Sequence, residues 1–323
     1  MFTSATFQRK IIKDAKGSAM LNLAGVKELK IVPFLLPPLA EQERIVAKIE
    51  ELFSELDAGL ESLKTAQAQL KTYRQAVLKY AFEGKLTNDN INEGELPNGW
   101  KLTSLGENTE LITKGASPKW QGINYVDDSS QVLFITSENV RDYFLNISEP
   151  KYLQKEFNLK QNRSILRTGD VLLNIVGASI GRAAIFDLDI NANINQAVAL
   201  IRLKQNTSQK YVCYFLNSNS ARSFYNLNKV DFARANLSLA DVNNIPFLLP
   251  PFEEQQRIVE EIESRLSVCD KLEETINVSL KQSEALRQSI LKQAFEGKLV
   301  SQDERNEEAV FLNQPDKQMT LFV

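Results

Sequence analysis

One phrase occurs twice in this chain of 323 residues. Pro33–Val46 reads PFLLPPLAEQERIV, and Pro246–Val259 reads PFLLPPFEEQQRIV. A shift of 213 positions (246 minus 33) aligns residues 33–86 with 246–299 without a gap, and 27 of the 54 aligned positions are identical. Because chance similarity and shared core packing do not produce so long an unbroken register, we infer a duplication. Any fold of this chain must therefore contain the segment in two copies.

Each copy is predicted to form one long helix between helix-breaking residues. The proline pairs Pro37–Pro38 and Pro250–Pro251 cannot lie inside a helix, and acidic residues that favour a helix N-terminus follow them directly. Gly84 and Gly297 stand in the phrase AFEGKL at the end of each copy, where glycine commonly terminates a helix. The helix between these signals would run about 40 residues, or roughly 60 Å.

Apolar residues in the first copy recur at alternating spacings of four and three, which is typical of a coiled-coil seam. The second copy is looser, because Arg265 stands where Leu52 maps, and Gly59 interrupts the first seam and is predicted to allow a close crossing. We predict that the helices form an antiparallel coiled coil; two separate oligomerisation helices are the alternative. The predicted interface residues are Ile45, Ile49, Leu52, Leu56, Leu63, Leu70, Val77, Ile258, Ile262, Leu266, Leu272, Ile276 and Ile290.

The segment between the two copies has a different composition and is predicted to be a mixed α/β domain. Turn residues separate its short β-like runs, and 210–225 has the pattern of one helix with a buried apolar face. The fold class is therefore α+β, a mixed domain flanked by two long helices. The predicted strands are Val132–Thr136, Val171–Val176, Ala183–Phe186 and Val198–Leu203.

Composition excludes several classes of protein. The chain has no histidine, which is the commonest metal ligand and general base, and its 2 cysteines cannot form a structural zinc site alone. We expect no metal, no catalytic residues and free thiols in a reducing cytoplasm; an enzyme with carboxylate chemistry is the formal alternative. No apolar run has the length of a membrane span, so no membrane partner is expected. A net charge of −3 permits DNA binding only through a local basic surface.

Basic, amide and hydroxyl residues alternate in the predicted loops of the middle segment. Arg, Asn and Gln can pair with base edges, whereas Lys and Ser suit phosphates. Each residue by itself is better explained by a solvated loop, so the prediction rests on the set. The residues predicted to contact DNA are Lys114, Lys119, Gln121, Ser137, Asn139, Arg141, Arg163, Arg182, Lys229, Arg234 and Asn236.

The N-terminal stretch echoes the end of the middle domain. GSAMLNLAGVKELKIVPFLLPP is similar to ARANLSLADVNNIPFLLPP, which indicates the tail of another copy of that domain. The predicted organisation is a remnant domain tail at 1–32, a first long helix at 33–87, the middle domain at 88–245, a second long helix at 246–300 and a disordered tail at 301–323.

These motifs together resemble one protein family. The phrases LPPLAEQERIV and LPPFEEQQRIV, each leading into AFEGKL, resemble the conserved regions of specificity (S) subunits of type I restriction-modification systems. ELPNGWKLTSLGE at Glu95–Glu107 is similar to the start of that family's target recognition domains. Gly169–Phe186 and Asn193–Leu203 resemble their central and late motifs.

The resemblance implies a non-catalytic subunit. Such a subunit has two target recognition domains that each read half of a bipartite site in double-stranded DNA, and two antiparallel helices hold the domains apart. It docks methyltransferase subunits that methylate adenine, and restriction subunits add translocation and cleavage. We therefore expect no cofactor in this chain, and S-adenosylmethionine, ATP and Mg²⁺ in its partners.

The chain departs from the family because most of the first recognition domain is missing. We expect it to pair with a second copy of itself or with another S fragment; a decoy that binds methyltransferase without reading DNA is a further alternative. Gln318–Phe322 is similar to short peptides that bind sliding clamps, although an ordinary tail explains the same residues.

Overall fold

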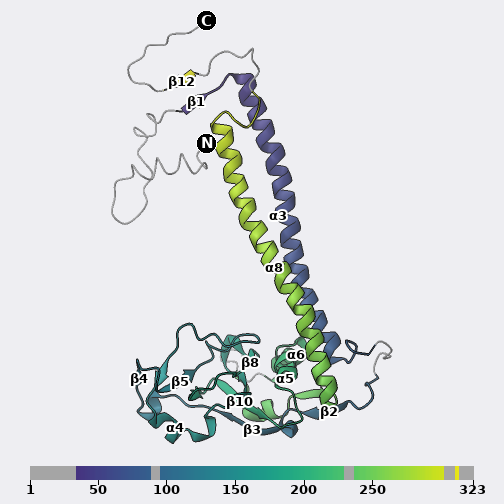
Figure 1. Cartoon of the computed structure of the whole chain (residues 1–323), viewed down its shortest axis with the longest axis vertical. Coiled ribbons are helices and arrows are strands. Elements are labelled where there is room, and N and C mark those ends of the chain that lie inside the picture. Colours follow the sequence, from purple (N-terminus) through teal and green to yellow (C-terminus); the bar gives the residue numbers. More distant parts are fainter. Residues whose placement is uncertain (1–33, 89–94, 229–235, 302–309, 313–323) are drawn as a thin grey trace. The chain divides into compact units, whose positions relative to one another are not determined.

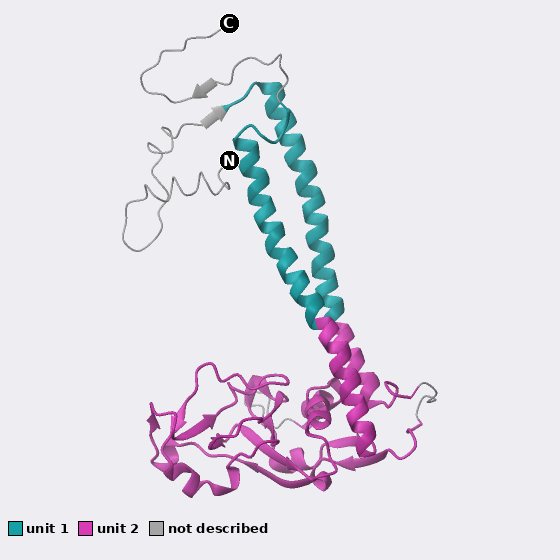
Figure 2. Ribbon diagram, viewed as in Figure 1, with its two compact units in different colours: residues 1–70, 270–323 teal, residues 71–269 magenta. Residues whose placement is uncertain are grey.

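The computed structural model separates the chain into two compact units (Figure 2). We call Met1–Leu70 with Asp270–Val323 the helical unit and Lys71–Cys269 the domain unit. The predicted remnant at 1–32 lies outside the described residues. The structure describes residues 34–88, 95–228, 236–301 and 310–312.

The duplicated segment forms two helices of 44 residues each, α3 (Leu39–Phe82) and α8 (Phe252–Phe295). The carbonyl of Pro38 accepts the first backbone hydrogen bonds of α3, at 2.9 and 3.0 Å. Gly84 and Gly297 follow the helix ends with φ of 77° and 67°, a conformation that glycine adopts without a steric penalty. The predicted helices and their stop signals are therefore confirmed. No helix among the described residues is apolar and long enough to cross a membrane.

Within the helical unit the two helices run antiparallel (Figure 1). Arg287 forms an ion pair with Asp57, and Gln67 Nε2 lies 3.4 Å from Asn277 Oδ1. From the first contact to the second, the residue number rises by ten in α3 (67 − 57) and falls by ten in α8 (287 − 277). This opposite progression confirms the predicted antiparallel arrangement.

One set of buried or half-buried positions coincides in the two helices under the 213-residue shift. After two steps of four, this set keeps an alternating spacing of three and four, as a coiled-coil seam requires. The seam of α8 admits Glu273, Ser283 and Arg287, which explains why its apolar pattern is looser. The equivalent buried or half-buried positions are Ile45, Ile49, Phe53, Leu56, Leu60, Leu63, Gln67, Leu70, Arg74, Val77 and Ala81 in α3, and Ile258, Ile262, Leu266, Cys269, Glu273, Ile276, Leu280, Ser283, Arg287, Ile290 and Ala294 in α8.

Two sequence predictions about the seam are wrong. Leu272 is 48% exposed, and its repeat equivalent Gly59 is also exposed, with no atom within 4 Å of an added Cβ. Gly59 therefore makes no close crossing; the seam passes one residue later, at Leu60 and Glu273. Two successive steps of four, Ile45–Ile49–Phe53 in α3, move the alternate seam positions by one residue, so Phe53 takes the position predicted for Leu52 and Leu60 takes that of Gly59.

The middle domain contains two four-stranded sheets. The first is antiparallel throughout, and the second contains one parallel pair, β5 with β9. The predicted strands are confirmed as β5, β7, β8 and β10. The strand order is β3 (Thr109–Lys114), β10 (Val198–Leu203), β7 (Val171–Asn174) and β8 (Ala183–Ile185) in the first sheet, and β4 (Tyr125–Val126), β6 (Tyr152–Leu153), β5 (Val132–Ile135) and β9 (Ala192–Ile194) in the second.

Both faces of the first sheet are covered. Leu172 and Leu200 pack in one cluster with Leu133 of the second sheet. Their neighbours Leu173 and Ile201 point to the other face and pack with the helices of the domain unit. Because successive side chains of a strand point to opposite faces, β7 and β10 are apolar along nearly their whole length.

The helix predicted at 210–225 is two helices, α5 (Gln209–Leu216) and α6 (Asn219–Asn228). The chain breaks at Asn217, whose side chain bonds to the backbone of Ala183 instead of lying on a continuous helix surface. Asparagine side chains compete for backbone groups in this way and favour helix ends. The shorter helices are α4 (Glu156–Lys160), α7 (Leu239–Asn243) and the 3₁₀ turns η1 (Gly106–Asn108), η2 (Lys119–Gln121), η3 (Asn162–Ser164) and η4 (Gly177–Ser179).

Two further antiparallel pairs involve the duplicated phrase. β11 (Pro246–Leu249) pairs with β2 (Lys101–Ser104), and β1 (Phe34–Leu36) pairs with β12 (Val310–Leu312). The prediction of a disordered tail at 301–323 is therefore wrong at β12, which consists of apolar residues in an otherwise polar stretch. The clamp-like peptide predicted near the C-terminus lies outside the described residues.

Candidate nucleic-acid interface

The ends of several strands place four loops together at one end of the middle domain. Lys114, the last residue of β3, pairs with Ala199 near the start of β10. Asn174, the last residue of β7, pairs with Val198. The loops that follow β3 and β7 therefore meet the loop that precedes β10. We call residues 115–124, 136–146, 175–182 and 195–197 the loop face.

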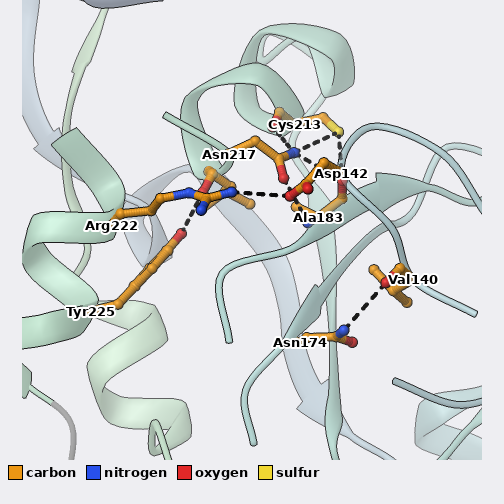
Figure 3. A network of polar contacts seen from close by, with 9 residues as sticks. Val140, Asp142, Asn174, Ala183, Cys213, Asn217, Arg222 and Tyr225 are labelled. Carbon is orange, nitrogen blue, oxygen red and sulfur yellow. Dashed lines mark hydrogen bonds and ion pairs between the residues drawn. The ribbon is translucent and has the colours of Figure 1, made fainter. Parts of the chain in front are cut away.

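Asn174 ties two of these loops together. It is fully buried, and its Nδ2 donates to the carbonyl of Ser137 at 2.9 Å and, at 3.4 Å, to the carbonyl of Val140 (Figure 3). An amide that serves two backbone carbonyls holds the loop at a fixed distance from β7. Sequence analysis missed Asn174. The sequence feature that could have indicated it is a polar residue directly after the apolar residues of a predicted buried strand.

Backbone hydrogen bonds join the remaining loops. Ile175 N donates to Ala197 O and Asn195 N donates to Ile135 O, each at 3.0 Å. A Cβ on Gly115 would lie 1.7 Å from a backbone oxygen of β9, so only glycine permits this approach. The loop face is therefore a framework of fixed backbone from which side chains project.

The loop after β5 is held in an uncommon conformation. Tyr143 has a φ of 75°, rare for a bulky residue, and its N–H donates to Ala183 O at 2.9 Å. Its neighbour Asp142 forms a 3.1 Å ion pair with Arg222 of α6 (Figure 3). These contacts fix the backbone directly after Arg141. Strained residues of this kind concentrate at functional sites.

The buried side-chain amide of Asn217 holds the backbone of Ala183, to which Tyr143 is bonded. Asn217 Oδ1 accepts from Ala183 N at 3.1 Å, and its Nδ2 donates to Ala183 O at 2.9 Å and to Cys213 O at 2.8 Å (Figure 3). Burial raises the pKa of the Cys213 thiol to about 12, so this cysteine stays protonated at neutral pH. The hydrogen bonds of Asn217 therefore stabilise the fold, and Cys213 is not a reactive thiolate at neutral pH.

The loop face and the strand end beside it carry cations that the domain leaves unpaired. Lys114 and Lys119 are exposed and Arg141 and Arg182 half-exposed, and none of these four makes an ion pair with the residues that the structure describes. By contrast, Arg202 on β10 is neutralised by the buried Asp170, at 2.7 Å. The unpaired cations are available to an external anion.

The acidic residues of the loop after β5 are already neutralised. Glu138 lies 3.3 Å from Lys151, and Asp142 is paired with Arg222. Neither carboxylate therefore compensates Arg141, which lies between them in sequence. The local balance is positive although the whole chain carries a net charge of −3.

Other residues of the predicted DNA-binding set have intrachain roles. Asn139 Oδ1 accepts from Thr136 N at 2.8 Å, and its Nδ2 donates to Asn146 O at 2.9 Å, so its amide closes the loop after β5. The backbone carbonyl of Gln121 accepts from Lys160 Nζ at 2.7 Å.

The structure separates the rest of the set. Ser137 and Asn236 lie at the loop face, the latter through a bridge to Val176. Arg163 is exposed on η3, and no hydrogen bond or ion pair joins it to the loop face within the described residues. Lys229 and Arg234 lie outside the described residues. A DNA contact by any member of the set stays a prediction.

The described residues thus combine a mixed domain that carries cations on its loop face with two long helices. Residues 97–282 match the model of the type I restriction modification DNA specificity domain. The chain belongs to this family. No group of three or more His, Cys, Asp or Glu side chains that could hold a metal ion occurs in the described parts of the chain.

Curated relatives agree with this membership. The chain is 32% identical over 281 residues to the specificity subunit of the type I restriction enzyme EcoBI of Escherichia coli, covering 83% of this chain and 58% of the relative. The specificity subunit of the StySPI enzyme of Salmonella potsdam is 28% identical over 308 residues, covering 93% of this chain and 65% of the relative. The chain thus spans roughly three fifths of the length of these relatives.

Two solved structures share the fold. A chain from a study of complex assembly and conformational transition in a type I R-M system superposes with a TM-score of 0.66 at 24% identity, covering 81% of this chain and 61% of the other. The HsdS subunit from Thermoanaerobacter tengcongensis superposes with a TM-score of 0.60 at 21% identity, covering 91% and 68%.

Proposed function

We propose that this chain is a non-catalytic specificity subunit of a type I restriction-modification complex, and that its middle domain reads one half-site in double-stranded DNA through the loop face. The observation that carries the proposal is the set of unpaired cations, Lys114, Lys119, Arg141 and Arg182, on or beside a fixed loop framework. Arginine can bond a guanine edge bidentately, and lysine serves phosphates. A fixed backbone lowers the entropy lost when these side chains engage DNA.

The long helices would serve as a spacer and as a docking surface for methyltransferase subunits. Each helix of 44 residues spans about 66 Å at 1.5 Å per residue, which converts half-site spacing into a fixed length. In the helical unit Leu39, Val46 and Leu286 are between 51% and 70% exposed. Exposed apolar side chains on a helix suit a protein partner. Restriction subunits would join through the methyltransferase.

We infer that this chain associates with a second copy of itself or with another S fragment, because the described residues contain a single recognition domain. A two-fold arrangement would supply two identical domains and predicts a palindromic bipartite site. Pairing with a different S fragment would predict two unlike half-sites. The mass of the purified chain, measured by light scattering with and without methyltransferase, distinguishes these arrangements.

The test of DNA reading is methylation of a randomised DNA library by the methyltransferase together with this chain. We expect adenine methylation at one sequence motif, and none when the chain is omitted. A stable complex that methylates no preferred sequence would instead support the decoy alternative. The double variant Arg141→Ala/Arg182→Ala should form the same complex and lose the motif preference.

A further inference from the structure

The strand β1 takes its hydrogen-bonding partner from the C-terminal segment. Phe34 pairs with Leu312 and Leu36 with Val310, in antiparallel sense. Both strands belong to the helical unit, and Figure 1 labels them beside each other. Because β1 carries the first copy of the duplicated phrase, its partner can be compared with the partner of the second copy.

The second copy pairs with the first strand of the middle domain. Within the domain unit, Phe247 of β11 pairs with Thr103 of β2, again in antiparallel sense. The 213-residue shift superposes Phe34 on Phe247. Leu312 therefore stands opposite β1 in the position that Thr103 occupies opposite β11.

The chain connections to β2 and β12 are also equivalent. β2 begins 15 residues after Leu86, the last residue of the first copy (101 − 86), and β12 begins 11 residues after Leu299, the last residue of the second copy (310 − 299). Each copy of the phrase is therefore paired with a strand that follows the other long helix. The duplication has preserved a strand-docking site at both positions.

The two partner strands differ in length and in how far their pairing extends. β2 has 4 residues and leads to the buried Leu105, whose N–H donates to Ile245 O at 2.9 Å and extends the pairing. β12 has 3 residues. The site on β1 is thus filled by a shorter strand than the site on β11.

We propose that β1 is a docking strand for the first strand of a second recognition domain, and that β12 fills this position from within the chain. The occupant would be a strand like Lys101–Ser104, supplied by a separate S-subunit fragment. Strand addition to an exposed sheet edge is a common mode of recognition, because backbone hydrogen bonds supply the affinity. The identification of the second domain as a recognition domain rests on the proposed function. The docking site itself is inferred from the strand pairing of β1.

Hydrogen exchange tests the docking strand directly. Phe311→Pro removes a backbone donor from β12 and disfavours its pairing, while Phe311→Val keeps a strand-forming residue. We expect amide exchange in residues 34–36 to accelerate about tenfold in the proline variant and to stay within about twofold in the valine variant. Unchanged exchange in the proline variant would overturn the proposal.

A peptide then identifies the occupant. The peptide PNGWKLTSL, which corresponds to residues 97–105, is added in excess to the Phe311→Pro chain. Restored protection of residues 34–36 by this peptide, but not by a scrambled one, supports a docking site for a β2-type strand. Restoration only by the tail peptide EEAVFLNQ (residues 307–314) overturns it. Neither readout requires DNA, so loss of DNA reading would not imitate these results.

Discussion

Asn174 Nδ2 lies 2.9 Å from the carbonyl oxygen of Ser137, and this bond fastens the end of β7 to the loop that carries Arg141. The two residues are 37 positions apart in the chain. The side chain that holds the loop face in shape is thus buried and belongs to a strand, whereas the side chains that can reach DNA belong to the loops.

Asn174→Ala should impair both stability and DNA reading. The change leaves the part-buried carbonyl of Ser137 and the buried carbonyl of Val140 without this donor, at a cost of about 1–3 kcal/mol in the free energy of unfolding. Urea denaturation measures this loss, and the sequence preference of methylation measures the effect on the loop. The exposed Asn162→Ala should change stability by less than about 0.5 kcal/mol. Intact sequence preference in Asn174→Ala would contradict a loop-holding role.

Arg141→Ala and Arg182→Ala should each weaken DNA binding by about 1–3 kcal/mol if the side chain touches a base. Fluorescence anisotropy over a series of salt concentrations separates two kinds of contact. A phosphate contact lowers affinity for all sequences and reduces the salt slope, whereas a base contact relaxes sequence preference. Lys101→Ala, on β2 outside the loop face, is the matched control and should bind as the parent chain does. Unchanged binding by both arginine variants would refute the interface.

The double change Leu56→Asp/Leu63→Asp should separate the helices of the helical unit. Both leucines are half-buried seam residues, and an unpaired carboxylate on a buried seam is strongly unfavourable. We expect loss of assembly in light scattering, with the near-ultraviolet circular dichroism of the middle domain retained. Changing the exposed Glu55 and Lys64 to Asp and Glu, respectively, is the control. Assembly that survives the leucine changes would show that the seam does not hold the helices together.

Gly59→Ala should stabilise the chain. An added Cβ meets no atom within 4 Å, and the residue lies inside a helix where φ is not positive. Alanine is favoured over glycine in a helix interior by about 0.5–1 kcal/mol. Thermal unfolding should therefore shift upwards; a fall in the midpoint would indicate that a partner approaches the helix closely at this position.

The buried thiol of Cys213 should make the fold sensitive to alkaline pH. Its pKa is raised to about 12 in the folded chain by burial, whereas an unfolded thiol titrates near about 8.5. Above the unfolded pKa only the unfolded chain releases this proton, so the free energy of unfolding falls by about 1.4 kcal/mol per pH unit. Urea denaturation should show little change between about pH 7 and pH 8 and should approach this slope between about pH 9 and pH 10. Cys213→Ala should flatten it, and an unchanged slope would assign the effect to another group.

Much of the architecture follows from local pattern. The structure confirms the proline and glycine boundaries of α3 and α8 and the four predicted strands. These features could be predicted because hydrophobic periodicity and residues such as proline and glycine determine the conformation of the backbone near them. The predicted seam is wrong by one residue at Leu272 and Gly59, because two successive steps of four near the start of each helix move the alternate seam positions.

The candidate site was less accessible to sequence reasoning. A pattern of basic and amide residues does not distinguish Asn139, whose amide closes its own loop, from Arg141, which has no ion-pair partner among the described residues. Nor does it show that Arg222 neutralises Asp142 from 80 positions away.

The two-copy plan, the long helices and the family follow from the sequence, because they depend on residues adjacent in the chain. Packing sets which cations lack an ion-pair partner among the described residues, which asparagines hold loops, and that β12 pairs with β1. Those outcomes depend on contacts between segments that are distant in the chain. Tertiary packing sets these contacts, and local hydrophobic periodicity does not encode them.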